Sequence, residues 1–139
     1  MRKHLLWILP IIILVLSGCA RQTGEIKANL GEKFSLAIGQ GASITGENLK
    51  IRFKEVIGDS RCPQGVQCIW AGEASSLIEI TYSGSTFSKT LTQPGPSEPP
   101  QTDFQEYIIT FDLQPYPQEG VKIESKDYRL QLEINRKTV

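Results

Sequence analysis

Residues 49–54 read Leu-Lys-Ile-Arg-Phe-Lys, and this strict alternation of apolar and basic side chains decides the fold class. Successive side chains of a β-strand point to opposite faces of a sheet, so a period of two predicts a strand with one buried and one solvated face. The period slips by one residue at Glu55 and Val56, as it does at a β-bulge.

The same alternation recurs on both sides of this strand. It is found in residues 33–38, 74–82, 86–91, 107–113 and 128–135. Turn-forming residues, mostly glycine, serine and asparagine, separate the runs, and no stretch has a helical period. About six or seven half-buried strands in so short a chain predict an all-β fold, a single antiparallel β-sandwich that is either immunoglobulin-like or a small barrel. The cysteine and tryptophan spacing of true immunoglobulin domains is absent.

One segment, residues 92–106, interrupts the alternation with four prolines and a glycine in its first half. Proline lacks the amide hydrogen that a sheet requires, so we expect this segment to be a loop outside the sheet. A loop of this length is either functional or disordered, and the sequence leaves both possibilities open.

Basic residues stand at the beginning of the chain, and an apolar run over residues 5–16 follows them. The run is shorter than the twenty or so residues that cross a bilayer, which favours a processed export segment over an uncleaved membrane anchor. Leu16-Ser17-Gly18-Cys19 resembles the bacterial lipobox. That resemblance implies diacylglycerol on the Cys19 thiol, cleavage before Cys19 and often a further acyl chain, with the protein attached to the membrane through these lipids.

The number of cysteines agrees with this interpretation. The sequence has three, and lipidation of Cys19 accounts for the odd one. Cys62 and Cys68 are then an even pair in an oxidising compartment, where we expect them to form a disulfide that closes a short loop. We therefore expect a signal peptide over residues 1–18, a lipidated tether over 19–31 and a β-sandwich domain over 32–139.

The charge balance does not suggest a nucleic-acid partner. The sequence has 15 basic and 15 acidic residues, and loss of residues 1–18 removes Arg2 and Lys3, which leaves a formal charge of −2. There is no basic stripe and no interleaving of arginines with aromatic residues of the kind that holds phosphates. We expect no nucleic acid among the partners.

The most unusual segment, residues 59–72, reads DSRCPQGVQCIWAG. Pro63 and Gly65 favour a tight reversal that brings the two cysteines within disulfide reach. Asp59 and Arg61 can pair or cap backbone groups around the loop, and Trp70 is placed to cover the disulfide.

This segment resembles a recurrent pattern of small exported bacterial proteins, D-S-R-C-P followed by C-x-W-A-G, and the likeness extends loosely to residues 113–117 and 127–129. The resemblance implies the fold and the disulfide but carries no activity. Two interpretations follow. In the first, the loop is a structural corner of the sandwich that the disulfide closes, with Trp70 in the core. In the second, it belongs to a binding surface formed by Trp70, Tyr116, Asp59 and Arg61.

Catalytic and metal chemistry find little support in the residue types. The only histidine, His4, lies in the export segment, so we expect no zinc site, no catalytic triad and no cofactor. Thiol–disulfide exchange through Cys62 and Cys68 lacks the C-x-x-C spacing, and no carboxylate pair stands out for a hydrolase. The protein is therefore not expected to be an enzyme.

The leading hypothesis is a lipid-anchored protein of the cell envelope, on the extracytoplasmic face of the cell membrane or the outer membrane. It binds an envelope protein, a glycan or a small ligand through loops on a rigid scaffold. The alternatives are a purely structural or accessory lipoprotein and, behind it, a thiol–disulfide or carboxylate-dependent enzyme.

Overall fold

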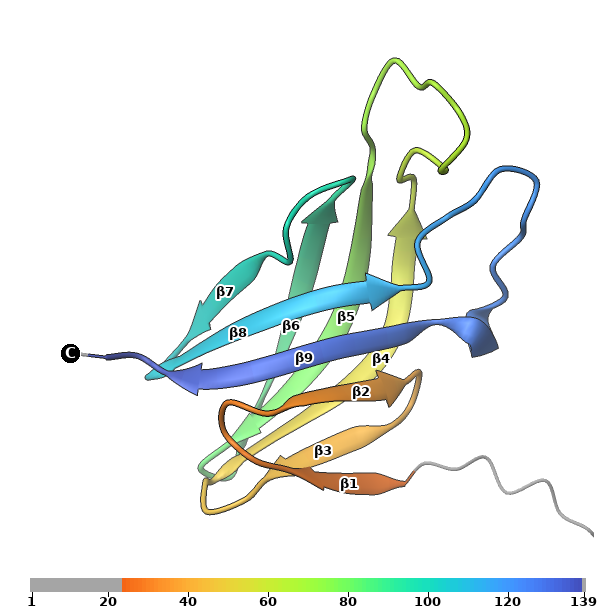
Figure 1. Cartoon of the computed structure of the whole chain (residues 1–139). Coiled ribbons are helices and arrows are strands. Elements are labelled where there is room, and N and C mark those ends of the chain that lie inside the picture. Colours follow the sequence, from red (N-terminus) through yellow and green to blue (C-terminus); the bar gives the residue numbers. More distant parts are fainter. Residues whose placement is uncertain (1–23, 139) are drawn as a thin grey trace, which may run out of the picture.

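Two β-sheets pack face to face in the computed structural model, which describes residues 24–138 (Figure 1). The first sheet has the strand order β1-β3-β4-β5-β6 and the second the order β2-β9-β8-β7. The strands are β1 (Glu25–Ala28), β2 (Lys33–Ala37), β3 (Gly41–Ile44), β4 (Leu49–Asp59), β5 (Glu73–Tyr82), β6 (Ser85–Pro94), β7 (Gln101–Phe104), β8 (Tyr107–Gln114) and β9 (Arg129–Arg136). Cys19 and the lipobox lie outside the described residues.

The connections confirm an all-β sandwich. Strands β3 to β6 follow one another as antiparallel neighbours in the first sheet, and β7 to β9 do so in the second. Among the pairs of named strands in residues 24–138, only β1 with β3 is parallel. In constant-type immunoglobulin domains no more than two consecutive strands share a sheet, whereas β3 to β6 are four consecutive strands of one sheet here, so the strand order differs from theirs.

The core lies between the sheets and is made by the alternating residues. Leu49, Ile51 and Phe53 are at most 1% exposed, as the pattern predicted. The predicted slip is also confirmed, because the pairing of β4 with β5 shifts register between Phe53 and Glu55. The inward residues of β8 and β9 complete the core: Tyr107, Ile109, Phe111, Leu113, Leu130, Leu132 and Ile134.

The expected tether over residues 19–31 is too long, because β1 occupies residues 25–28. This strand pairs in parallel with β3, and Ala28 is only 2% exposed. Ile26 and Ala28 do alternate with charged residues, but four residues are too few for periodicity to reveal. The folded domain therefore begins before residue 32.

The expectation of a continuous loop over residues 92–106 is also wrong. Strand β6 runs through Gln93 to Pro94, β7 occupies Gln101–Phe104, and only residues 95–100 between them are irregular. Pro94 is tolerated because β6 is an edge strand, where a missing amide hydrogen breaks no ladder.

The helical content of residues 24–138 is one short 3₁₀ turn, η1 (Ser125–Asp127). Within this range, no helix has the length and apolar character needed to cross a bilayer.

Candidate binding cleft

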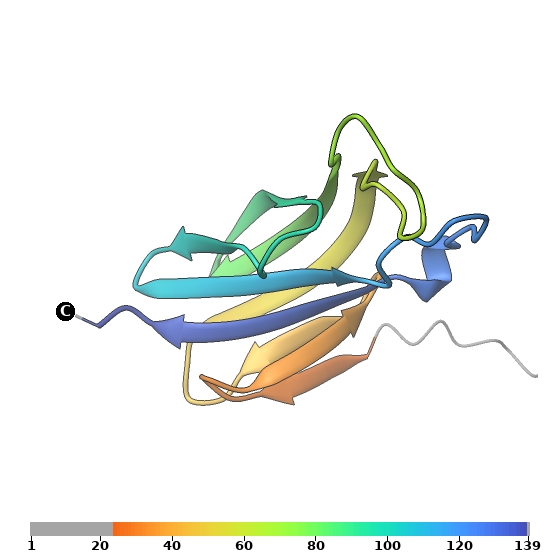
Figure 2. The ribbon, with the colours of Figure 1, turned by 45° about the horizontal axis from the view of Figure 1, so that its top comes forward.

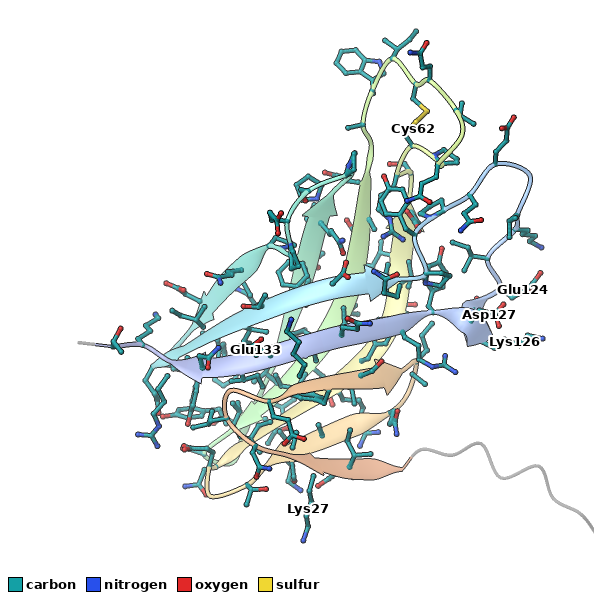
Figure 3. The ribbon with its side chains drawn as sticks, in the orientation of Figure 1. Lys27, Cys62, Glu124, Lys126, Asp127 and Glu133 are labelled. Atoms are coloured by element: carbon teal, nitrogen blue, oxygen red, sulfur yellow. A yellow bond between two sulfur atoms is a disulfide. The ribbon has the colours of Figure 1, made fainter. Side chains whose placement is uncertain are left out.

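A loop over residues 60–72 connects β4 to β5 and projects beyond the sheets at one end of the sandwich (Figures 1 and 2). The predicted disulfide is present. The Cα atoms of Cys62 and Cys68 are 5.9 Å apart, within the normal range, and Figure 3 shows the bridge in yellow. The neighbouring segment between β8 and β9 contacts this loop through a β-bridge of Gln64 with Gln118.

The base of the loop is a buried ion pair. The Arg61 side chain is fully buried, and its Nη2 and Nε atoms donate to Asp59 at 2.7 and 2.8 Å. Its guanidinium also donates to the carbonyl oxygens of Leu113, at 2.7 Å, and Pro115, at 3.1 Å. The predicted pairing of Asp59 with Arg61 is therefore found. It ties the loop to the end of β8, but neither residue forms part of an exposed binding surface.

Two tyrosines complete this network. The Tyr128 hydroxyl donates to Asp59 Oδ2 at 3.1 Å, and the Arg61 guanidinium lies 4.9 Å from the centre of the Tyr116 ring. Burial by itself would raise the pKa of Asp59, but the hydrogen bonds and the charge of Arg61 outweigh it and lower that pKa. Burial, followed by the charge of Asp59, raises the pKa of Tyr128 to about 12. At neutral pH the carboxylate is thus ionised and the phenol neutral.

The two arms of the loop approach each other too closely for a side chain. Gly72 has φ +69°, and a Cβ atom there would overlap the carbonyl oxygen of Ser60. Backbone hydrogen bonds join the arms, from Ser60 N to Glu73 O and from Cys62 N to Ala71 O, each 2.8 Å long. Glycine at position 72 therefore allows the loop to close.

The tip of the loop, residues 62–72, has no charged residue and presents apolar side chains to solvent. Ile69 is 93% exposed, Trp70 81% and Val66 41%. The prediction that Trp70 belongs to the core is therefore wrong. The loop extends past the ends of the strands, where neither sheet can cover the indole (Figure 1). Three charged residues, Glu124, Lys126 and Asp127, lie around η1 (Figure 3).

A cleft of about 610 Å³ separates the loop tip from residues 96–99 and from the end of β8. Trp70 and Tyr116 both line it, so the structure brings together two of the four predicted surface residues. Asp59 and Arg61 are not among the lining residues.

The polar lining of the cleft was missed by sequence reasoning. Gln93 Nε2 and Gln114 Nε2 donate to the two carboxylate oxygens of Asp112, each at 2.6 Å. Gln93 Oε1 accepts from the backbone amide of Leu113 at 2.7 Å, and Gln93 is only 5% exposed. Gln93 fell in the expected loop over 92–106. Asp112 lay in the expected strand over 107–113, and Gln114 lay in residues 113–117, to which the resemblance extended only loosely. No linear motif links the three.

Among residues 24–138, no group of three histidine, cysteine, aspartate or glutamate side chains is arranged to hold a metal ion. No protein-family model matches the chain, and neither a curated protein nor a solved structure does so.

Proposed function

We propose that the protein is a lipid-anchored, non-catalytic recognition module of the cell envelope that binds its ligand in the cleft beside the disulfide loop. One observation carries the proposal: Trp70 lies 81% exposed at the rim of this cleft, on the uncharged tip of a loop whose base is buried and ion-paired.

The construction of the loop supports recognition. Exposed Ile69 and Trp70 add nothing to the core, whereas tryptophan is enriched among the residues that dominate binding energy. The disulfide and the Arg61 network hold the loop in place before a ligand arrives. A preorganised loop loses less conformational entropy on binding than a free one.

The lipobox supports anchoring at Cys19. Only five peptide steps separate Cys19 from Gly24, and an extended chain of that length spans at most about 18 Å. This reach is shorter than a tether over residues 19–31 would give. With Cys19 anchored, it keeps the domain close to the membrane surface.

Anchoring is tested by metabolic labelling with an alkyne fatty acid and by mass analysis of the mature chain. We expect the label on the wild type, an amino terminus at Cys19 and no label on Cys19→Ser. A chain that keeps Met1 and carries no acyl mass would contradict lipid anchoring, but it would leave the proposal of ligand binding in the cleft untouched.

Recognition is tested with a photocrosslinking amino acid at Gln67, which lines the cleft, in intact envelopes. The matched control is Thr45, which is exposed at the opposite end of β4. We expect a discrete adduct from position 67 and none from position 45. Equal yields from both positions, or no adduct from either, would favour a structural or accessory lipoprotein.

A second candidate is thiol–disulfide exchange, because Cys68 is exposed and an external thiolate can approach the bridge. It predicts mixed disulfides with Cys68 in cells that carry Cys62→Ala. The recognition proposal predicts instead that the bridge stays oxidised during function and that no such partner accumulates.

A further inference from the structure

We infer that the cleft binds a neutral oligosaccharide; this inference rests on the proposed function and names its ligand class. It is carried by three features of the lining: its charge, its amide groups and its apolar surfaces.

The charge of the lining disfavours strongly ionic ligands. Asp112 is the only charged residue among the described residues that line the cleft. Each of its oxygens already accepts an amide hydrogen bond at 2.6 Å. An anionic ligand would meet this carboxylate with no cation to offset it, and burying an unpaired charge is strongly unfavourable. A cationic ligand would have to compete with the two glutamine amides.

The amide groups of the lining suit a ligand rich in hydroxyl groups. Four glutamines line the cleft: Gln64, Gln67, Gln93 and Gln114. An amide offers both donors and an acceptor, which matches a sugar hydroxyl that also donates and accepts. The buried amide of Gln93 is already bonded to Asp112 and Leu113, so the other three glutamines are the ones that meet the ligand. Gln114 uses its amide nitrogen on Asp112, which leaves its side-chain carbonyl oxygen without a hydrogen bond from residues 24–138. The side chains of Gln64 and Gln67 lie in exposed positions at the loop tip.

The apolar lining offers flat surfaces for sugar rings. Trp70 lies on one side of the cleft, and Pro96 and Pro99 line it from the neighbouring loop. A pyranose ring is apolar on its C–H faces, and these weakly positive hydrogens are attracted to the negative face of an indole. The volume of about 610 Å³ lies within the range of small-ligand sites and leaves room for more than one ring.

The position of Ile69 separates this ligand from a protein partner. Ile69 is the most exposed large apolar side chain among residues 24–138, at 93%, but it does not line the cleft. A protein docked over the loop tip would bury Ile69 and Trp70 together. An oligosaccharide in the cleft would contact Trp70 but not Ile69.

The test is isothermal titration of the mature chain with two neutral probes, tetra-N-acetylchitotetraose and cellotetraose. The cationic, fully deacetylated chitotetraose is the comparison. We expect at least one neutral probe to bind with Kd below about 1 mM, and the charged tetramer to bind at least about tenfold more weakly. Trp7 precedes Cys19, so Trp70 is the only tryptophan of the mature chain and its fluorescence reports the cleft directly.

Variants at the rim locate the contact. Trp70→Ala should weaken binding at least about tenfold, and Trp70→Phe, which keeps an aromatic face, should restore much of the loss. Ile69→Ser is the matched control and should bind as the wild type does. Circular dichroism and the melting midpoint of each variant show that it is folded.

Failure of this inference is distinct from failure of the proposed function. If neither neutral probe binds while position 67 crosslinks to a protein, the saccharide is excluded and the recognition module remains. Equal losses for Ile69→Ser and Trp70→Ala would also exclude the cleft as a saccharide site. If no probe binds and no adduct forms, both proposals fail.

Discussion

The base and the tip of the disulfide loop differ in which side chains they bury and which they expose. At the base, Arg61 is 2% exposed and its guanidinium donates to a carboxylate and two backbone carbonyls. At the tip, Ile69 and Trp70 are 93% and 81% exposed and pack against neither sheet. A polar residue is thus buried where an apolar one would be expected, and apolar residues are exposed where polar ones would be. The difference separates a part that maintains structure from a part that is available for contact.

The largest expected effect is at the base. Arg61→Ala leaves Asp59 buried without its cation and should lower the free energy of unfolding by about 4 kcal/mol. The measurement is urea unfolding. Lys122→Ala removes an exposed ion pair with Glu124 and should change stability by less than about 0.5 kcal/mol. Similar losses of unfolding free energy in both variants would mean that the buried ion pair stabilises the fold no more than the exposed one does.

Closing the loop should depend on Gly72 almost as strongly. Gly72→Ala combines a positive φ with overlap of the Ser60 carbonyl, and we expect a loss of about 3 kcal/mol. Gly84→Ala has φ +84° with no atom near the added Cβ, so it reports the backbone strain alone, about 1 kcal/mol. Equal losses in thermal unfolding would show that the arms of the loop can separate freely.

The disulfide should contribute an intermediate amount. Cys62→Ala opens a loop of seven residues and should lower stability by about 2 kcal/mol, because the unfolded chain regains freedom. The strand signature in circular dichroism should persist, since both sheets lie outside this loop. An unchanged melting midpoint would indicate that the bridge is not structural.

Acid should weaken the base of the loop selectively. The pKa of Asp59 is lower in the folded chain than in the unfolded chain, so the unfolded state binds more protons at low pH. The stabilisation is therefore present above the ordinary carboxyl pKa and is lost as pH falls through the folded value. Glu25 and Glu47 shift in the same direction, so the comparison is made against Asp59→Asn between pH 6 and pH 2.5. The melting temperature of the wild type should fall more steeply with decreasing pH than that of Asp59→Asn. Parallel curves would contradict the conclusion that ionised Asp59 stabilises the fold.

The smallest expected effect is at the tip. Ile69→Ser and Trp70→Ala should each change the free energy of unfolding by less than about 0.5 kcal/mol, because neither side chain belongs to the core. Chemical denaturation measures the change. A loss near 2 kcal/mol for Trp70→Ala would show that the indole has a folding role after all, and the contrast between base and tip would disappear.

Sequence reasoning recovered the parts of the fold that depend on local periodicity. The alternation at Leu49, Ile51 and Phe53 identified a buried face, and the slip at Glu55 identified a bulge. It missed β1, β3 and β7, because four residues are too few for a period of two to stand out. The strand order was out of reach, because it depends on pairings between residues far apart in the chain.

The candidate cleft was only half predictable, for a related reason. The unusual composition around Cys62 and Cys68 marked the loop, and its charge pair was expected at Asp59 and Arg61. Exposure of Trp70 could not be inferred, since an indole beside a disulfide is as compatible with a core as with a rim. The contacts of Gln93 with Asp112 form only when β6 and β8 come together across the two sheets.

The parallel pairing of β1 with β3 determines how the fold resists mechanical load. A pull directed along the axis of β1 would act on a strand that is in register with β3 from Gly41 to Ile44. Hydrogen bonds loaded in this direction share the force and must break together, whereas bonds pulled from the side would open one after another. Under such a load the first strand would resist through all the hydrogen bonds of its ladder at once.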